Sequence, residues 1–473
     1  MIFLQVFVIK IAKSLDKIIV IYYNIAVFLR KMNDGCADCF KSRKKKEKQM
    51  KNYLKMTREE LREEYSSLKN KYEPYVKMGL SLDLSRGKPN SDQLDVSQAL
   101  LTAPLTRREC FDGNVDCRNY GILDGLPGMK KLFSEMLGIP ENYITVGGNS
   151  SLQLMYDAIS RAMLFGVLGS ERPWCQEKGL KWICVTPGYD RHFRITETFG
   201  FELISVPMTD DGPDMDMVEE LVGDPKVKGI WCVPKYSNPT GNTYSDETVR
   251  RLASMKCAAV DFRIMWDNAY AVHDLYDTGD KLLDIFETAE KYGNADRIFY
   301  FSSTSKITFP GAGVALMAAT PANLKQITPY LGAQTIGYDK LNQLRHMIFF
   351  SDSTSVNAHM MEMAKTLRSK FDITLKALST LEGTGIAEWT KPRGGYFISL
   401  DVMDGCATRV YELMKNAGVT LTSVGATFPY GKDPRDRNLR IAPTYPSDAD
   451  LTLATEILAI SVKLAALEKL LNV

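Results

Sequence analysis

Short apolar runs alternate with stretches of helical periodicity through the middle of the chain. Runs of mainly apolar residues, bounded by turn-forming or polar residues, predict buried strands at residues 182–186, 201–206, 229–233, 262–266, 298–301 and 314–318. Helical stretches such as 214–222 and 246–255 separate several of these strands. This alternation predicts an α/β fold with a mainly parallel sheet that helices cover on both faces.

Three of the predicted strands lead into residues that could carry chemistry. The strand ending at 233 is followed by Asn238, the strand ending at 266 by Asp267 and Tyr270, and the strand 298–301 by Lys306. Open α/β sheets bind their ligands at the carboxyl ends of the strands. A partly desolvated lysine at such a place can attack a carbonyl carbon and form a Schiff base. Taken singly, each residue is equally compatible with a cap, a turn, a core position or a solvated charge.

A glycine turn precedes another predicted helix. Gly147 and Gly148 end a short strand, Asn149 or Ser150 can cap the helix, and the helix presents an apolar face at residues 152, 155, 159 and 163. Free N–H groups and the positive end of the helix dipole converge at such a start, which favours an anion such as phosphate. An ordinary capped helix is the alternative.

The segments on either side of the sheet predict a second, smaller unit. Thr57 and Glu60 form a potential capping box for a charged helix over 57–75. Beyond the sheet, the pattern predicts a helix, a strand, a helix, a strand and a closing helix at residues 351–381, 394–402, 407–417, 439–441 and 448–470. We therefore expect a large domain over 101–349 and a smaller α+β domain from 51–100 and 350–473.

Composition and charge restrict the class of protein. The chain has 473 residues and a net charge of +2, so it is long enough for two domains and gives no indication of nucleic-acid binding. Its nine cysteines are scattered, and the pair Cys36 and Cys39 has no second pair to complete a zinc site, so no metal is expected. Reduced thiols in a cytoplasmic protein are the simplest interpretation.

The first fifty residues differ from the rest. Residues 1–29 are apolar but interrupted by charges, so no run reaches the length of a membrane span, and 41–51 is a basic run. We expect residues 1–50 to be an extension, arising from an upstream start or serving as a weak membrane-surface appendage, without firm membrane association.

A set of motifs in a fixed order resembles a known family. The motifs are GGNSS (147–151), PGY (187–189), SNPTG (237–241), DNAY (267–270), STSK (303–306) and RIAP (440–443). Together they resemble the fold-type I, class I/II aminotransferases that carry pyridoxal phosphate. The longer runs SRGKP (85–89), STSKITFPGAG (303–313) and NLRIAPTYPS (438–447) are similar to the divergent type Ic aspartate aminotransferases. The resemblance covers residues 51–470.

This resemblance implies roles around the cofactor ring. Lys306 would bind pyridoxal 5′-phosphate as a Schiff base and then act as the base of the reaction. Asp267 would pair with the pyridine nitrogen and keep it protonated, which makes the ring an electron sink. Asn238 and Tyr270 would hydrogen-bond the phenolic oxygen of the ring, and Tyr189 would stack on it. The expected catalytic residues are Lys306, Asp267 and Tyr270.

The resemblance also assigns the phosphate and the substrate. The phosphate would lie against Gly148, Asn149, Ser150, Ser303 and Ser305. Tyr120 would reach the phosphate of a neighbouring subunit, which implies a homodimer with shared active sites. Arg440 would hold the substrate α-carboxylate in a bidentate pair, next to Gly87 and Asn238.

The sequence leaves two positively charged groups unassigned, one for the phosphate and one for the substrate. Relatives place a phosphate-binding arginine shortly after the Pro-Gly that follows the lysine, but here Gly313 stands in that place, and Arg393 and Arg345 are candidates to replace it. A dicarboxylate substrate also needs a cation for its distal carboxylate, and the candidates are Lys340, Arg345, Arg86 and Lys88.

The implied function is a transfer of the amino group from L-aspartate to 2-oxoglutarate by a ping-pong route. One alternative is an aminotransferase for aromatic or other neutral amino acids. The other is a non-catalytic, aminotransferase-like effector domain, as in winged-helix regulators, although no helix-turn-helix pattern precedes the sheet.

Overall fold

The computed structural model describes residues 52–473. The expectations for residues 1–50, including the Cys36–Cys39 pair, lie outside this part. Within it, no helix combines the length and apolar character needed to cross a membrane. The seven cysteines that it contains are free thiols.

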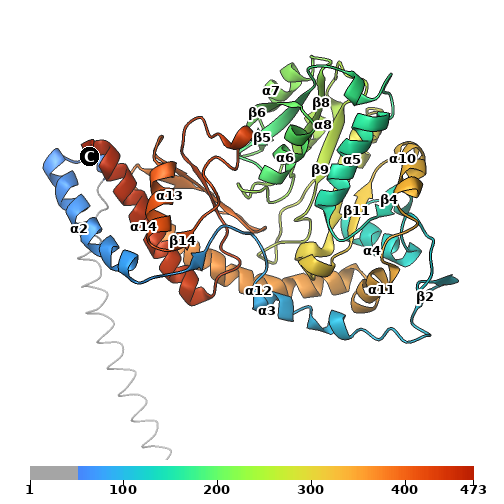
Figure 1. Cartoon of the computed structure of the whole chain (residues 1–473), viewed down its shortest axis with the longest axis horizontal. Helices are drawn as coiled ribbons and strands as arrows, with labels where there is room; N and C mark the ends of the chain where they lie inside the picture. Colours follow the sequence, from blue (N-terminus) through green and yellow to red (C-terminus); the bar gives the residue numbers. More distant parts are fainter. Residues whose placement is uncertain (1–51) are drawn as a thin grey trace, which may run out of the picture. The chain divides into compact units, whose positions relative to one another are not determined.

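An eight-stranded sheet forms the centre of the fold (Figure 1). Its order is β4 (Ile144–Val146), β11 (Ala315–Ala318), β10 (Ile298–Ser303), β9 (Arg263–Asp267), β8 (Val227–Cys232), β5 (Lys181–Thr186), β6 (Glu202–Thr209) and β7 (Gly212–Pro213). Only β11 and β7 run against their neighbours. The six predicted strands are all present, with ends shifted by up to three residues, and the prediction of a mainly parallel α/β sheet is confirmed.

Alternation along each strand separates two apolar layers. On β10, Ile298 and Tyr300 face one core and Phe299 and Phe301 face the other. The first core is completed by α4 (Pro127–Leu137), α7 (Met215–Leu221), α8 (Asp246–Ser254), α9 (Ile285–Glu290), α11 (Lys340–Phe349) and α12 (Ser353–Leu378). The second is completed mainly by α5 (Ser151–Phe165) and α6 (Asp190–Thr198).

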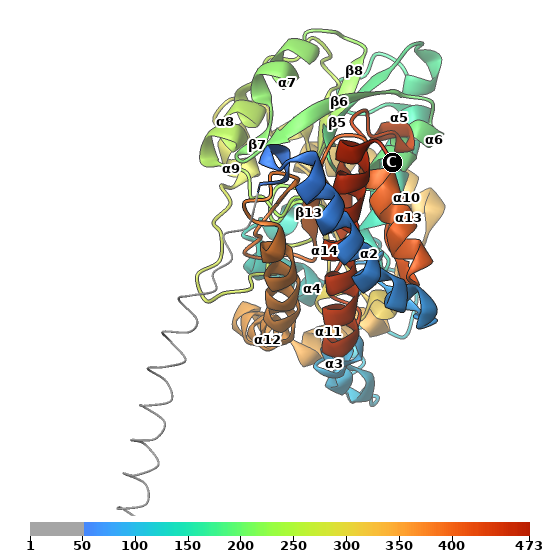
Figure 2. The same cartoon turned by 90° about the vertical axis from the view of Figure 1, so that its left-hand side faces the viewer.

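A second sheet and four helices share another core. The antiparallel sheet consists of β12 (Ala387–Trp389), β13 (Ile398–Val402) and β15 (Asn438–Ile441). Helix α14 (Asp448–Leu471) packs against α2 (Arg58–Lys77), α12 and α13 (Ala407–Asn416), as Figures 1 and 2 show. The two-residue strand β1 (Leu82–Asp83) pairs with β14 (Val419–Thr420). The predicted capping box of Thr57 and Glu60 is present at the start of α2.

Two local predictions differ from the structure. Residues 394–397 do not belong to the predicted strand, because Gly394 and Gly395 lie against Tyr236, and Gly395 has a φ of +78°. On α5 the buried positions are Leu154, Met155, Ala158, Ile159 and Ala162. The apolar face is therefore rotated from the predicted one, and residues 152 and 163 lie at its margin.

Candidate active site

A cavity of about 430 Å³ lies at the carboxyl ends of β5, β8, β9 and β10. Residues from β15 and from the loop after β1 complete its wall. The structure thus brings together eight residues singled out from the sequence, namely Arg86, Gly87, Tyr189, Asn238, Asp267, Tyr270, Lys306 and Arg440.

Lys306 stands on a short 3₁₀ turn, Thr304–Lys306, that directly follows β10. Its amine lies 4.8 Å from the centre of the Tyr270 ring. Among residues 52–473, no carboxylate lies within ion-pair distance of this amine. The amine is therefore available to a ligand in the cavity.

Asp267 ends β9, and the parallel pairing of β9 with β10 sets it opposite Phe301. The residue is 3% exposed. Its Oδ2 lies 2.9 Å from His192 Nε2, but its Oδ1 is buried and has no hydrogen-bond partner among residues 52–473. A buried carboxylate oxygen without a donor is costly unless a ligand supplies one, so Oδ1 marks the place of a ligand N–H group.

Arg440 reaches the cavity from β15, opposite Ser399 on β13. Its Nη1 donates to Asp190 Oδ1 at 2.8 Å and to Asn238 Oδ1 at 3.4 Å, and the guanidinium lies over the Phe397 ring at 5.1 Å. A Cβ at Gly87 would overlap the Phe397 ring, so only glycine lets the loop pass this close. The Nε atom of Arg440 is buried and has no hydrogen-bond partner in the described part of the chain, which leaves that side of the guanidinium for a carboxylate.

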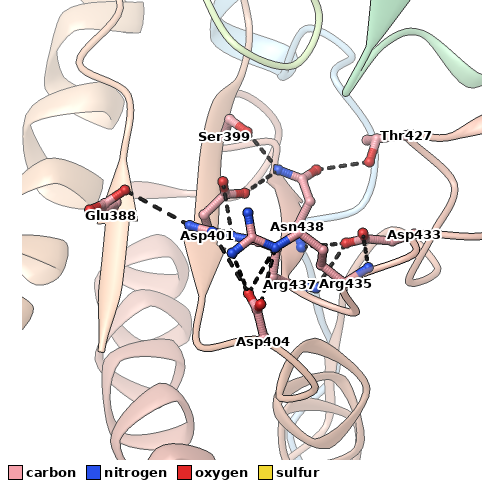
Figure 3. A network of polar contacts seen from close by, with 9 residues as sticks. All are labelled: Glu388, Ser399, Asp401, Asp404, Thr427, Asp433, Arg435, Arg437 and Asn438. Atoms are coloured by element: carbon pink, nitrogen blue, oxygen red, sulfur yellow. Dashed lines mark hydrogen bonds and ion pairs between the residues drawn. The ribbon is translucent and has the colours of Figure 1, made fainter. Parts of the chain in front are cut away.

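A polar network fixes the start of β15, two residues before Arg440 (Figure 3). Asn438 donates to Ser399 Oγ at 2.9 Å and to Asp401 Oδ1 at 2.7 Å, and accepts from Thr427 Oγ1 at 2.8 Å. The carbonyl of Thr427 accepts the N–H of Gly188, next to Tyr189, at 2.8 Å. The strand of Arg440 and the loop of Tyr189 are thereby held to each other.

The expected phosphate end is built from the start of α5 and the turn of Lys306. Ser305 Oγ donates to the carbonyl of Asn149 at 2.7 Å and accepts from Ser303 Oγ at 3.2 Å. Ser150 is the N-cap residue of α5, but its side chain makes no capping hydrogen bond. Its hydroxyl is therefore not committed to the helix start.

The missing arginine at 313 has a steric explanation. A Cβ on Gly313 would lie 2.8 Å from Ser305 Oγ and 3.0 Å from the carbonyl oxygen of Asn149. Any side chain there would separate the two segments at the phosphate end. Arg393 does not replace it on this chain, because its Nη2 donates to the carbonyl of Thr278 at 2.6 Å and it lines a different cleft. Arg345 lies on α11 and does not line the cavity.

The cations proposed for the distal carboxylate differ in whether they line the cavity. Arg86 lines the cavity. Lys88 does not, and its ammonium lies 3.6 Å from the centre of the Tyr445 ring. Lys340 is buried and donates to the carbonyl of Gly121 at 3.0 Å. Tyr120 is 83% exposed and lies outside the cavity of its own chain.

Three residues of the site were missed from the sequence, and all follow the PGY motif. His192 is 1% exposed, bonds Asp267 and stacks on Trp231 with ring centres 4.5 Å apart. Asp190 pairs with Arg440, and Arg191 lines the cavity. The available signal was the run of Asp, Arg and His directly after the motif, in a chain with only four histidines.

The residues present fit pyridoxal phosphate. Lys306 offers an amine that pairs with no carboxylate of the described residues, and Asp267 offers a buried acceptor for a ring N–H. Burial raises the pKa of Tyr189 to about 12, with the Lys306 charge opposing, so its phenol stays neutral beside the cavity. Hydroxyl groups and a helix start lie next to the turn of Lys306, where they can receive a phosphate.

Comparison with known proteins agrees with this geometry. The aspartate amino-transferase family matches residues 56–473. An aspartate aminotransferase of Corynebacterium glutamicum is 47% identical over 86% of this chain and 95% of its own length. A crystal structure of an aspartate transaminase from the same species has a TM-score of 0.86 at 45% identity, over 89% of this chain and 99% of that one. An α-aminoadipate aminotransferase of Thermus thermophilus, solved with N-(5′-phosphopyridoxyl)-L-leucine, shares the fold with a TM-score of 0.66 at 20% identity, over 84% of this chain and 95% of that one.

Proposed function

Since the chain belongs to the aspartate aminotransferase family and is a pyridoxal-phosphate-dependent aminotransferase, we propose that it transfers the amino group of L-aspartate to 2-oxoglutarate by a ping-pong route. The observation that carries this proposal is the convergence of Lys306, Asp267 and Arg440 on one cavity. The C. glutamicum relative, named an aspartate aminotransferase, supports the choice of amino acid.

Each residue of the chain has a distinct task in this proposal. Bound pyridoxal phosphate supplies the electron sink that the chemistry needs. The Lys306 amine holds the cofactor and moves the proton at the α-carbon of the substrate. Asp267 keeps negative charge beside the ring nitrogen, while Arg440 orients the substrate through its α-carboxylate. Asn238, which contacts Arg440, and Tyr270, which lies beside the amine, border the same space.

The charge of the cavity supports a substrate with two carboxylates. Lys306 and Asp267 face the cofactor. Among residues 52–473, the other charged side chains that line the cavity are three arginines, Arg86, Arg191 and Arg440, and one carboxylate, that of Asp190. These four side chains carry a net charge of about +2, which matches the two carboxylates of aspartate or 2-oxoglutarate. A neutral amino acid would leave one of these charges uncompensated.

We expect the R86L and R191L variants to discriminate against dicarboxylate substrates. At least one of them should lower kcat/KM for L-aspartate by about 10- to 100-fold, or about 1.4–2.8 kcal/mol, because a charged hydrogen bond to the distal carboxylate is lost. The same variant should leave kcat/KM for L-norvaline, which has no distal carboxylate, within about twofold. Steady-state kinetics with both amino acids give the measurement.

The matched control is K88M, whose lysine lies next to the same loop but outside the cavity. It should leave both substrates unaffected. Equal losses for aspartate and norvaline would reject a distal-carboxylate role for these arginines. A wild-type enzyme that prefers aromatic or neutral amino acids would reject the dicarboxylate assignment and support the alternative substrate class.

We further propose a homodimer in which Tyr120 serves the neighbouring active site. Tyr120 is 83% exposed, and Ile336, on a segment packed against the adjoining Gly121, is 63% exposed. Apolar side chains exposed together favour a protein–protein contact. Lys340, which donates to the carbonyl of Gly121, holds the Tyr120 loop in place for such a contact.

Mixing an inactive variant with one that binds the cofactor weakly tests this arrangement. K306A lacks the reacting amine, and Y120F should weaken cofactor binding by about tenfold through one lost hydrogen bond. In a hybrid dimer, the subunit with Lys306 intact receives Tyr120 from its K306A partner. At limiting cofactor, mixed and re-equilibrated subunits should therefore exceed the summed activity of the separate variants. No gain over either variant mixed with itself would mean that Tyr120 does not serve a neighbouring site.

Domain division and location complete the proposal. We propose a small domain from residues 51–100 and 350–473 and a large cofactor-binding domain from 101–349, with residues 1–50 as an extension. The shared core of α2, α12, α13 and α14 supports the first unit. The free thiols of the described cysteines are in keeping with a cytoplasmic location.

A further inference from the structure

All four histidines of the chain lie beside residues of the active site. His192 contacts Asp267. The other three contact residues 304–308, called here the lysine turn, and the tasks described above leave them without a role. Each comes from a different element: the loop after β9, helix α11 and helix α12.

His273 holds the backbone of Lys306 itself. It is 1% exposed, and its Nε2 lies 3.2 Å from the carbonyl oxygen of Lys306. Because a carbonyl only accepts, Nε2 carries the proton of this ring. The ring also packs edge-on against Tyr270, with centres 5.5 Å apart, and Tyr270 is the ring that lies beside the Lys306 amine. His273 therefore contacts both the main chain of the lysine and the wall beside its amine.

His346 holds the hydroxyl groups of the turn. Its Nδ1 donates to the carbonyl of Asn342 at 2.8 Å, so the neutral ring has an acceptor at Nε2. This Nε2 lies 3.0 Å from Thr304 Oγ1 and 2.9 Å from Thr308 Oγ1. Thr304 Oγ1 also accepts the N–H of Val314 at 2.9 Å, which leaves its own proton for His346. The acceptor role requires an uncharged ring.

His359 completes the set from α12. Its Nε2 donates to the carbonyl of Ile307 at 2.7 Å and lies 3.4 Å from Ser97 Oγ. The rings of Phe349 and Phe350 lie edge-on to it, with centres 5.4 Å and 5.3 Å away. His359 therefore holds the main chain of the residue directly after Lys306.

The surroundings keep these rings uncharged. Burial lowers the pKa of His273 to about 3. The charges of Lys306 and Lys235 act in the same direction, and the charge of Asp274 opposes them. Burial lowers the pKa of His346 to about 4, and the neighbouring Arg345 acts in the same direction. Burial also lowers the pKa of His359. These three histidines therefore add no positive charge beside the reacting lysine at neutral pH.

We propose that His273, His346 and His359 are positioning residues for Lys306, which as neutral imidazoles hold the lysine turn from three elements and so fix where its amine stands. A lysine side chain has four rotatable bonds, so the position of its amine depends on a fixed main chain. A displacement of about 1 Å at a reacting group can cost about 100-fold in rate. The inference rests on Lys306 being the reacting amine.

Paired substitutions test the proposal. H273L and H359L remove a donor to a carbonyl, and H346L removes an acceptor, whereas glutamine at each position keeps a neutral polar group near Nε2. We expect each leucine variant to lower kcat by about tenfold, with KM for aspartate within about twofold. Each glutamine variant should recover kcat to within about threefold of the wild type. In the leucine variants, the pH titration of the visible absorbance of the lysine–cofactor linkage should also shift.

A buried substitution elsewhere separates positioning from stability. T455V removes the hydrogen bond of a fully buried threonine on α14, and should lower Tm without moving kcat or the absorbance titration. If the leucine variants lower Tm but leave kcat and the titration unchanged, these histidines are structural only and the proposal fails. If K306A itself retained activity, the failure would lie in the role of Lys306 instead.

The pH dependence of stability tests the neutral state. Histidines of the unfolded chain take up protons near pH 6.5, whereas His346 in the folded protein does so near pH 4. The stability that neutral His346 contributes is complete above pH 6.5 and is lost as pH falls toward 4. Cofactor-free H346Q should therefore lose less Tm than the wild type over this range. An equal loss would mean that His346 is not held neutral, which would remove a premise of the proposal.

Discussion

Replacing Lys306 by alanine is expected to lower kcat for the aspartate reaction by at least about 10⁴-fold, the upper range for loss of one proton-transferring group. In the proposed function the same amine also forms the covalent link to the cofactor. No other lysine of residues 52–473 lines the cavity, so none can substitute for it. The measurements are steady-state kinetics and the visible absorbance of the linkage, which should be absent in K306A.

The fold should not depend on this lysine. Its amine makes no ion pair with any described residue, so Tm of the cofactor-free variant should stay within about 2 °C of the wild type, as for a substitution away from stabilising contacts. K325A, which removes an exposed lysine of α10 (Pro321–Gln334), is the matched control and should be fully active. Turnover by K306A within about 100-fold of the wild type would reject Lys306 as the reacting amine.

Replacing Asp267 by asparagine is expected to lower kcat by at least about 10³-fold, or about 4 kcal/mol, while leaving the cofactor-free protein as stable as before or more so. In the proposed arrangement Asp267 supplies the charge opposite the ring nitrogen, and the substitution removes that charge and with it the electron sink. In the absence of the cofactor, the carboxylate is a buried charge with one unpartnered oxygen, which costs free energy. Asparagine removes the charge and can still accept from His192.

Asp261, a second buried aspartate just before strand β9, provides the control. Asp261 is as buried as Asp267, but Lys228, Trp174 and Ser170 all contact its carboxylate at 2.8–3.2 Å. D261N should therefore lower Tm by several degrees and leave kcat within about twofold, because it breaks a satisfied buried pair. The prediction for Asp267 fails if D267N loses as much Tm as D261N, or if it stays within about tenfold of wild-type kcat.

Much of the fold could be predicted because its signals are local. Most strands of the central sheet are short apolar runs, and polar or turn-forming residues mark where they end. Lys306 and Asp267 follow two such runs, and parallel neighbours in a sheet end at the same edge. The apolar runs and the parallel order of the strands together therefore explain why the two side chains meet in one cavity. The helix face on α5 was misplaced because several consecutive residues there are apolar, so periodicity alone does not select the buried side.

The sequence by itself determined the α/β class, the positions of most strands and helices, and the residues at the strand ends that could bind a cofactor. Only the tertiary structure decided which groups complete the site. His192 meets Asp267 across 75 residues, and Asp190 meets Arg440 across 250. It also showed why Gly313 excludes a side chain and why three histidines surround the lysine turn. The physical reason is that periodicity and turn chemistry report on neighbours along the chain, whereas contacts between distant segments exist only once the layers have packed.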